Sequence, residues 1–95
     1  MKSIERPDYE LVLKVLRDAR LKAGLSQVQM AKLLKKLQPF VSAAEVGRVR
    51  LDLLQLQDWA RACGTDVVKL AQRFYDALPA SQRAPAKKTV QSRRR

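Results

Sequence analysis

Apolar positions recur along the chain every three or four residues, the spacing that places side chains along one face of a helix. Two short runs of this kind follow each other between residues 27 and 47. Their apolar positions are Met30, Ala31 and Leu34, then Phe40, Val41 and Ala44. Only Lys35, Lys36 and Leu37 separate the runs, which is too short a connection for anything but a corner. The pattern predicts two short helices joined by a tight turn.

Residues that favour helix ends delimit these segments. A preceding helix is expected to begin near Pro7, which suits a first turn, and to end at a left-handed Gly24. Ser26 and Gln29 have the spacing of a capping box, so the second helix is expected to begin there. Lys35 is expected in the left-handed conformation at the corner, which costs a non-glycine residue roughly 1 kcal/mol. The third helix is predicted to start with a cap at residue 38 and a proline at residue 39.

Two more helices are predicted after a loop at residues 46–50. Asp52 and Gln55 form a second capping box, and Gly64 ends this fourth helix. A fifth helix is expected to start at Thr65 or Asp66. The inward residues expected of the fourth helix are Leu53, Leu56, Trp59, Ala60 and Cys63, and those of the fifth are Val67, Leu70, Ala71, Phe74 and Leu78. We interpret the tryptophan and the cysteine as core residues, not as a ligand platform and a reactive thiol.

The composition changes after Pro79. The stretch ASQRAPAKKTVQSRRR contains six cations, no acid and almost no large apolar side chain. Such a stretch cannot bury enough surface to offset the entropy of ordering. The sequence therefore predicts an all-α fold, with a five-helix domain over residues 1–79 and a disordered basic tail over residues 80–95.

The charge of the chain favours an anionic partner. Its 95 residues include 20 Lys and Arg against 9 Asp and Glu, for a net charge of +11. This balance suits nucleic acid or an acidic membrane surface. No run approaches the ~18 apolar residues of a membrane span, and the N-terminus lacks the apolar centre of a signal peptide. The expected location is the cytoplasm, in association with the nucleoid.

The residue types needed for most chemistry are missing. The chain has one cysteine and no histidine, so an internal disulfide, the usual zinc ligands and the commonest general base are all excluded. No catalytic constellation is recognisable. We therefore expect neither an enzyme nor a metal site, and no cofactor.

Two short helices with a tight turn are the layout of a helix-turn-helix, whose second helix lies in the DNA major groove. The residues that suggest a family are AGLSQ (Ala23–Gln27), Ala31, Gln38, FVS (Phe40–Ser42), Glu45, Gly47 and RLDLLQLQDWARACG (Arg50–Gly64). With these residues the chain resembles the Cro and phage-repressor family, also called XRE-like, over about residues 10–78.

The resemblance implies specific roles at the DNA. Gln27 resembles the glutamine that contacts phosphate, and Gln38 the one that pairs bidentately with adenine. Ser42 would face a base edge or a phosphate, and Arg48 and Arg50 would touch the backbone. The complete predicted set of DNA-binding residues is Gln27, Lys32, Lys36, Gln38, Pro39, Ser42, Ala43, Val46, Arg48 and Arg50.

The resemblance also implies an ion pair between Arg20 and Glu45 that ties the first helix to the third. The sequence departs from the family at Lys35, where glycine is usual, and on the outer face of the third helix, which lacks long polar side chains. Because Ala43 and Val46 can touch thymine methyl groups but cannot form bidentate hydrogen bonds, base discrimination is expected to be modest or to use DNA shape. Gln38 is alternatively a plain helix cap.

Three functions are compatible with these features. The first is a sequence-selective regulator of double-stranded DNA, acting as a repressor and reading a short inverted repeat as a homodimer. The second is a nonspecific nucleic-acid binder in which the tail dominates. The third is an adaptor whose apolar third helix binds a protein partner. Val68 and Tyr75 add apolar surface to the fifth helix beyond its inward stripe, which favours a homodimer.

Overall fold

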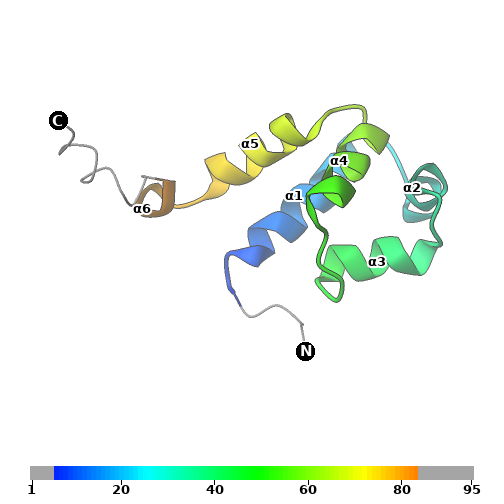
Figure 1. Ribbon diagram of the computed structural model, residues 1–95, viewed down its shortest axis with the longest axis horizontal. Coiled ribbons are helices and arrows are strands. Elements are labelled where there is room, and N and C mark those ends of the chain that lie inside the picture. The colour runs from blue at the N-terminus through cyan, green and yellow to red at the C-terminus, as the bar shows by residue number, and fades with distance from the viewer. Residues whose placement is uncertain (1–5, 84–95) are drawn as a thin grey trace.

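The computed structural model describes residues 6–83, and every regular element in that range is a helix (Figure 1). The helices are α1 (Tyr9–Lys22), α2 (Gln27–Leu34), α3 (Gln38–Val46), α4 (Leu53–Ala62), α5 (Val67–Ala77) and α6 (Ala80–Arg83). The first five confirm the predicted all-α fold. Expectations for residues 1–5 and 84–95 lie outside the described residues. Within the described range, no helix is long and apolar enough to cross a bilayer.

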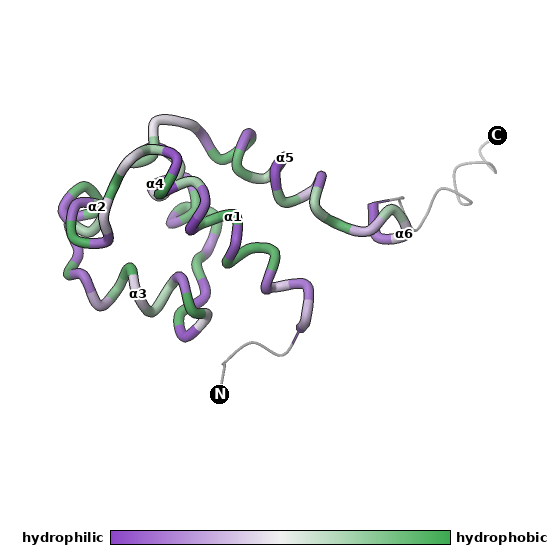
Figure 2. The backbone as a smooth tube through the Cα atoms, turned by 180° about the vertical axis from the view of Figure 1, so that it is seen from behind, coloured by the Kyte–Doolittle hydropathy of each residue, from purple (hydrophilic) through white to green (hydrophobic). Residues whose placement is uncertain are grey.

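The helix α1 lies at the centre of the arrangement (Figure 1). It packs against α3 on one side and α5 on another, while α4 contacts both α2 and α5. The pair α2 and α3 packs together at one end of the molecule, and α6 lies beyond α5 at the opposite end. In Figure 2, hydrophobic and hydrophilic positions alternate along the helices, as expected where each helix turns one side inward.

The core forms around Trp59, which is completely buried together with Leu16, Met30 and Val41. The indole Nε1–H of Trp59 donates a hydrogen bond to the Leu16 carbonyl at 3.0 Å, so its polar atom is satisfied inside the core. Cys63 is half-buried, with its Sγ 3.9 Å from the Sδ of Met30. Burial raises the pKa of the Cys63 thiol, which favours the protonated form. The interpretation of Trp59 and Cys63 as core residues is consistent with this geometry.

The predicted caps of α2, α4 and α5 are confirmed. The Ser26 hydroxyl accepts from the Gln29 N–H at 3.0 Å, and the Gln29 side chain accepts from the Ser26 N–H at 2.8 Å. Asp52 and Gln55 make the same reciprocal pair. Of the two candidates for the start of α5, Asp66 is the cap. Each cap joins residues three apart, so local sequence is sufficient to predict it.

The turn between α2 and α3 has the expected left-handed residue. Lys35 has φ 59° and ψ 43°, and the N–H of Lys36 donates to the Ala31 carbonyl at 2.9 Å. This bond closes the end of α2 and turns the chain toward α3.

Two boundaries differ from prediction at α3. Gln38 is the first helical residue and not the cap, which is Leu37 in an extended conformation. Pro39 tolerates this shift because the first N–H groups of a helix have no intrahelical partner, so a proline in the first turn does not fix the start to one residue. Val46 is the last residue of α3 and not part of the loop, and the helix ends at Gly47 with φ 88°.

Two inward predictions were wrong. Leu53 and Ala71 were expected in the core, but both are exposed. They line an open groove between α1, α4 and α5 instead of a closed interior. Periodicity indicates which side of a helix faces its neighbours, but not whether those neighbours close over it.

The expected start of the tail is also different. Residues 80–83, assigned to the tail, form the single turn α6, in which the Gln82 N–H donates to the Pro79 carbonyl at 2.8 Å. The Tyr75 hydroxyl donates to the Arg83 carbonyl at 2.8 Å, which fastens α6 to α5. The prediction for the remainder of the tail lies outside the described residues.

Candidate nucleic-acid interface

The outer side of α3 carries the residues predicted to face DNA. Gln38, Pro39 and Val46 are exposed, and Ser42 and Ala43 are partly exposed. The inward side chains of α3 are Val41, Ala44 and Glu45. All five predicted residues therefore share one accessible face, and their contact with DNA remains a prediction.

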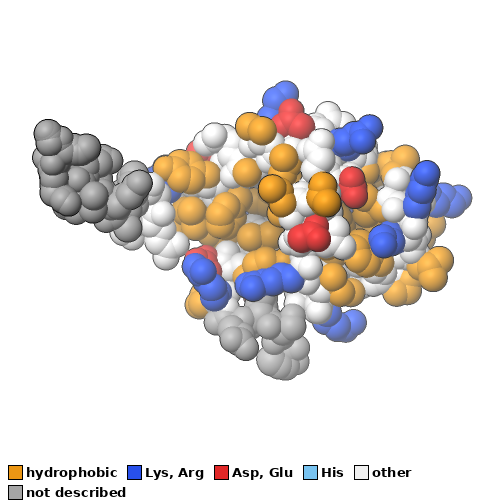
Figure 3. Space-filling view, in the orientation of Figure 1, with side chains coloured by type: hydrophobic (Ala, Val, Ile, Leu, Met, Phe, Trp, Pro, Cys, Tyr) orange, Lys and Arg blue, Asp and Glu red, His pale blue; other side chains and the backbone are white. Residues whose placement is uncertain are grey.

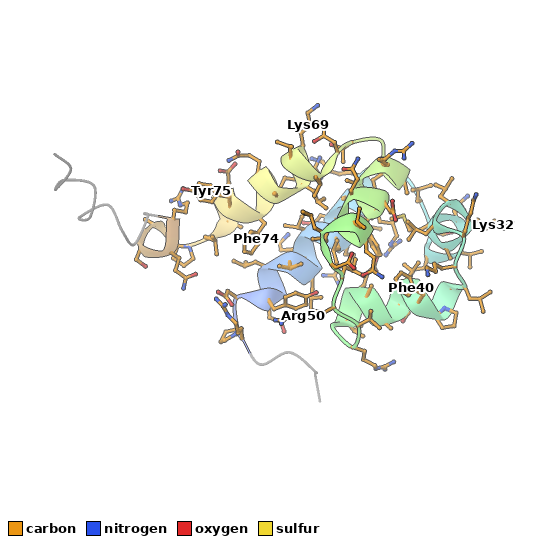
Figure 4. The ribbon with its side chains drawn as sticks, viewed as in Figure 1. Lys32, Phe40, Arg50, Lys69, Phe74 and Tyr75 are labelled. Carbon is orange, nitrogen blue, oxygen red and sulfur yellow. The ribbon has the colours of Figure 1, made fainter. Side chains whose placement is uncertain are left out.

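Cations lie before and after α3 along the chain. Lys36 lies just before the helix, with its Nζ 5.2 Å from the centre of the Phe40 ring. Arg48 follows the helix and is exposed. Arg50 stacks its guanidinium over the Tyr9 ring of α1, 4.6 Å from the ring centre (Figure 4). Cations thus precede and follow α3 along the chain, and their contacts to a DNA backbone stay a prediction.

Lys32 does not join this group. It is exposed on α2, and in Figure 4 it projects from that helix away from α3. The contribution of Lys32 to DNA binding stays a prediction, as do those of Lys36, Arg48 and Arg50.

The predicted ion pair between Arg20 and Glu45 is confirmed, and it is buried. The guanidinium Nε lies 2.6 Å from Glu45 Oε2, and Nη2 lies 3.0 Å from Oε1. Arg20 is 8% exposed and Glu45 7%. The hydrogen bond to Glu45 raises the pKa of Arg20, and burial opposes it more weakly. Arg20 also donates to the Leu25 carbonyl at 2.9 Å, which ties the pair to the connection before α2.

This ion pair continues as a hydrogen-bonded chain to the start of α3. Gln27, the first residue of α2, donates from Nε2 to Glu45 Oε1 at 3.0 Å. Gln38 donates from Nε2 to Gln27 Oε1 at 2.7 Å. We call the four residues Arg20, Glu45, Gln27 and Gln38 the glutamine relay. It connects the core to the side chain predicted to read a base.

The relay leaves Gln38 with the groups needed to read adenine. Its amide nitrogen carries two hydrogens, and one bond to Gln27 leaves the second available. That hydrogen and the amide oxygen are the pair that matches the N7 and N6 positions of adenine. A side chain already held at one atom loses less entropy on binding than a free one.

Sequence reasoning missed Leu37 as a candidate for this surface. It is 79% exposed and occupies the cap position directly before Gln38. An apolar side chain at this place is suited to a thymine methyl group. Its exposure could have been predicted from its place in the sequence. A large apolar residue in a three-residue turn has few neighbouring residues that could cover it.

The comparisons with known proteins agree with this geometry. A family model described as helix-turn-helix matches residues 16–70. A solved XRE-family-like protein from Pseudomonas syringae pv. tomato str. DC3000 is 35% identical, with a TM-score of 0.69 over 76% of this chain and 88% of that one. The chain belongs to the XRE-like helix-turn-helix family. The membership confirms the resemblance seen in the sequence.

Two other solved structures, a gene regulator and a hypothetical transcription factor, share the fold at lower identity. The clp gene regulator ClgR from C. glutamicum is 20% identical, with a TM-score of 0.69 over 80% of this chain and 99% of that one. The hypothetical transcription factor NHTF from Neisseria is 24% identical, with a TM-score of 0.61 over 87% and 93%. No curated protein matches the sequence. These two likenesses concern the arrangement of helices alone.

Proposed function

We propose that this XRE-like protein is a transcription regulator that binds a short inverted repeat in double-stranded DNA as a homodimer and acts as a repressor. Family membership supports a DNA-binding transcription regulator. The observation that supports base reading by α3 is the glutamine relay, which holds Gln38 at the accessible start of α3. The function is binding, not catalysis, and it takes place where the DNA is, on the nucleoid in the cytoplasm.

In this proposal α3 lies in the major groove and Gln38 reads an adenine. Gln27 contacts a phosphate, assisted by the free N–H groups at the start of α2. Leu37, Ala43 and Val46 contact thymine methyl groups. Since these three carry no hydrogen-bonding side chain, base discrimination is modest and DNA shape contributes to it.

Backbone contacts orient α3 in the groove. Lys36 precedes the helix, and Arg48 and Arg50 follow it. In this proposal these three cations contact phosphates. Occupation of the site by two copies then obstructs polymerase. No effector or cofactor is needed for this mechanism.

An adaptor function has one specific observation in its favour. Leu37 and Val46 are exposed apolar residues at the two ends of α3. Such residues also suit a hydrophobic protein surface. The nonspecific-binder alternative depends on the cations of residues 84–95. The salt dependence of DNA binding, compared between the full chain and a chain that ends after Arg83, tests it.

The decisive experiment is selection of bound duplexes from a random pool, followed by measurement on the selected and a scrambled duplex. Replacing Gln38 by Ala should reduce the ratio of the two affinities by about 1–3 kcal/mol, the value of one bidentate base contact. Gln72, an exposed glutamine of α5 bonded to Asp76, provides the matched control, and Gln72→Ala should leave the ratio unchanged. A pool that yields no enriched sequence would refute selective reading and favour the other two functions.

A further inference from the structure

The first residue of α1 and the connection after α3 meet at a cation–π contact. The guanidinium carbon of Arg50 lies 4.6 Å from the centre of the Tyr9 ring. Arg50 is exposed, whereas Tyr9 is half-buried (Figure 4). Figure 3 shows Lys and Arg side chains gathered over the start of α1 and the connection after α3. The contact therefore joins an arginine predicted to touch DNA to a helix that contains no predicted DNA-binding residue.

The Tyr9 ring holds this guanidinium without neutralising it. A carboxylate would also hold an arginine, but it would cancel the charge and occupy the donors that a phosphate needs. An aromatic face attracts the cation through its quadrupole and leaves the N–H groups at the edge of the guanidinium plane accessible. Within residues 6–83, the Arg50 guanidinium makes no hydrogen bond or ion pair that would compete with a phosphate.

The acid next to Tyr9 is paired with a different arginine. Asp8 accepts a hydrogen bond from the Nε of Arg6, 3.0 Å from Asp8 Oδ1. This hydrogen bond is the main cause of the lowered pKa of Asp8, and the charge of Arg50 contributes least to it. Because Arg6 occupies the carboxylate, the contact that orients Arg50 is the one with the Tyr9 ring.

The useful part of Tyr9 is its ring and not its hydroxyl. The hydroxyl oxygen is buried and has no hydrogen-bond partner among the described residues. Such a hydroxyl costs stability, so phenylalanine should fit this position at least as well. Val12 of α1 and Phe74 of α5 line the same small hollow as Tyr9 and Arg50, with a volume of about 160 Å³. The ring thus lies where α1 and α5 pack together, which makes it a fixed support for a flexible arginine.

We propose that Tyr9 is a positioning residue for DNA binding, which holds Arg50 ready to contact a phosphate. This inference rests on the proposed function, in which Arg50 contacts the DNA backbone. A flexible arginine loses rotamer freedom when it binds, and a stacked guanidinium has already lost part of that freedom in the folded protein. Tyr9 itself does not touch DNA. The helix α1 contributes to affinity through the side chain that Tyr9 holds.

The stack is tested first in the free full-length protein by NMR. Relaxation of the Nε–H groups should show Arg50 more ordered than Arg48, an exposed arginine of the same connection, and this measurement needs no variant. The ring current of Tyr9 should shift the Arg50 side-chain protons upfield. Tyr9→Phe should keep this shift and Tyr9→Leu should remove it, while the Arg48 protons stay unchanged in both variants. Circular dichroism checks that both variants are folded.

DNA affinity then shows whether the stack matters for binding. Tyr9→Leu should weaken binding to the selected and the scrambled duplex equally, by about three- to tenfold, because an arginine that is not held must be ordered on binding. The loss is equal because phosphate contacts carry no sequence information. Tyr9→Phe should bind as the unchanged chain does. Weaker binding by Tyr9→Phe would assign the role to the hydroxyl and overturn the inference.

A double-mutant cycle separates positioning from a general effect on the structure. Arg50→Gln should weaken binding and reduce the slope of log affinity against log salt by about 0.9 per chain. When Arg50→Gln is present, Tyr9→Leu should have no further effect on affinity, because there is no guanidinium to hold. Arg48→Gln is the matched control, and in its presence Tyr9→Leu should keep its full effect.

The outcomes separate this inference from the proposed function. An Arg50 side chain as mobile as that of Arg48 overturns the inference, as does a Tyr9→Leu effect of equal size in the Arg50→Gln and Arg48→Gln proteins. Selective binding in either case would leave the proposed function standing. Coupling between Tyr9 and Arg50 on a scrambled duplex, in a chain that enriches no sequence from the random pool, would support the inference and refute selective regulation. A chain that binds neither duplex would refute both.

Discussion

Glu45 joins three helices through one buried carboxylate. It accepts from Arg20 of α1 and Gln27 of α2 while belonging to α3. The ion pair with Arg20 was predictable, because opposite charges stand at the two positions where the family has such a pair. The two glutamine bonds were not predictable, since they depend on side-chain rotamers that spacing along the chain does not determine.

Removing this carboxylate should be costly. Glu45→Ala leaves the Arg20 guanidinium buried without its partner, which should lower the free energy of unfolding by about 3–5 kcal/mol. The ion pair between Lys14 and Asp18 is the matched control, because it lies at the surface of α1 with half-exposed side chains. Asp18→Ala should cost about 0.5 kcal/mol or less. Urea titrations of the two variants give the comparison, and equal losses would contradict the assigned burial.

At the scale of elements, the capping boxes were predictable, and the exposure of two residues expected to face inward was not. The capping boxes at Ser26 and Asp52 were predictable because each involves only residues of the same turn. The exposure of Leu53 and Ala71 was not, because it depends on how closely the three helices that line the groove pack together. The single turn α6 was missed because four residues are too few for a periodic pattern.

The turn between α2 and α3 provides a prediction at this scale. Lys35 has a left-handed backbone, so Lys35→Gly should relieve strain and raise the free energy of unfolding by up to about 1 kcal/mol. For a domain of this size that corresponds to a rise of about 4–8 °C in Tm per kcal/mol. Thermal unfolding followed by circular dichroism measures it. Lys35→Ala removes the same charge but keeps the strain, so it should bring no such gain.

Gly24 allows the opposite change, in which a glycine with a left-handed backbone is replaced by a residue with a side chain. It has φ +75°, and a Cβ built there would meet nothing within 4 Å, so Gly24→Ala adds backbone strain without a steric clash. It should lower the free energy of unfolding by about 1 kcal/mol. If Lys35→Gly also lowered Tm, left-handed strain would not control the stability of these turns.

Over the whole molecule, positive charge is divided between the folded body and the C-terminal segment. Residues 84–95 carry five cations and no acid. Around α3, Lys36 and Arg50 each lie over an aromatic ring. Contacts to phosphate supply affinity without sequence information, and contacts to base edges supply discrimination. Affinity and base discrimination should therefore respond to different changes in the chain.

Ending the chain after Arg83 tests this division while keeping α6 and its bond to Tyr75. Each phosphate neutralised contributes about 0.9 to the slope of log affinity against log salt, so losing five cations should reduce the slope by up to about 4–5 per chain. Binding to every duplex should weaken, and the ratio of selected to scrambled affinity should persist. Gln38→Ala should reduce that ratio with little change in slope.

A full-length variant with the five cations replaced by glutamine is the control. It removes the charge but keeps the length of the chain, and it should behave like the truncation. If truncation abolished discrimination while Gln38→Ala preserved it, α3 would not be the reading element, and the basic segment would account for binding.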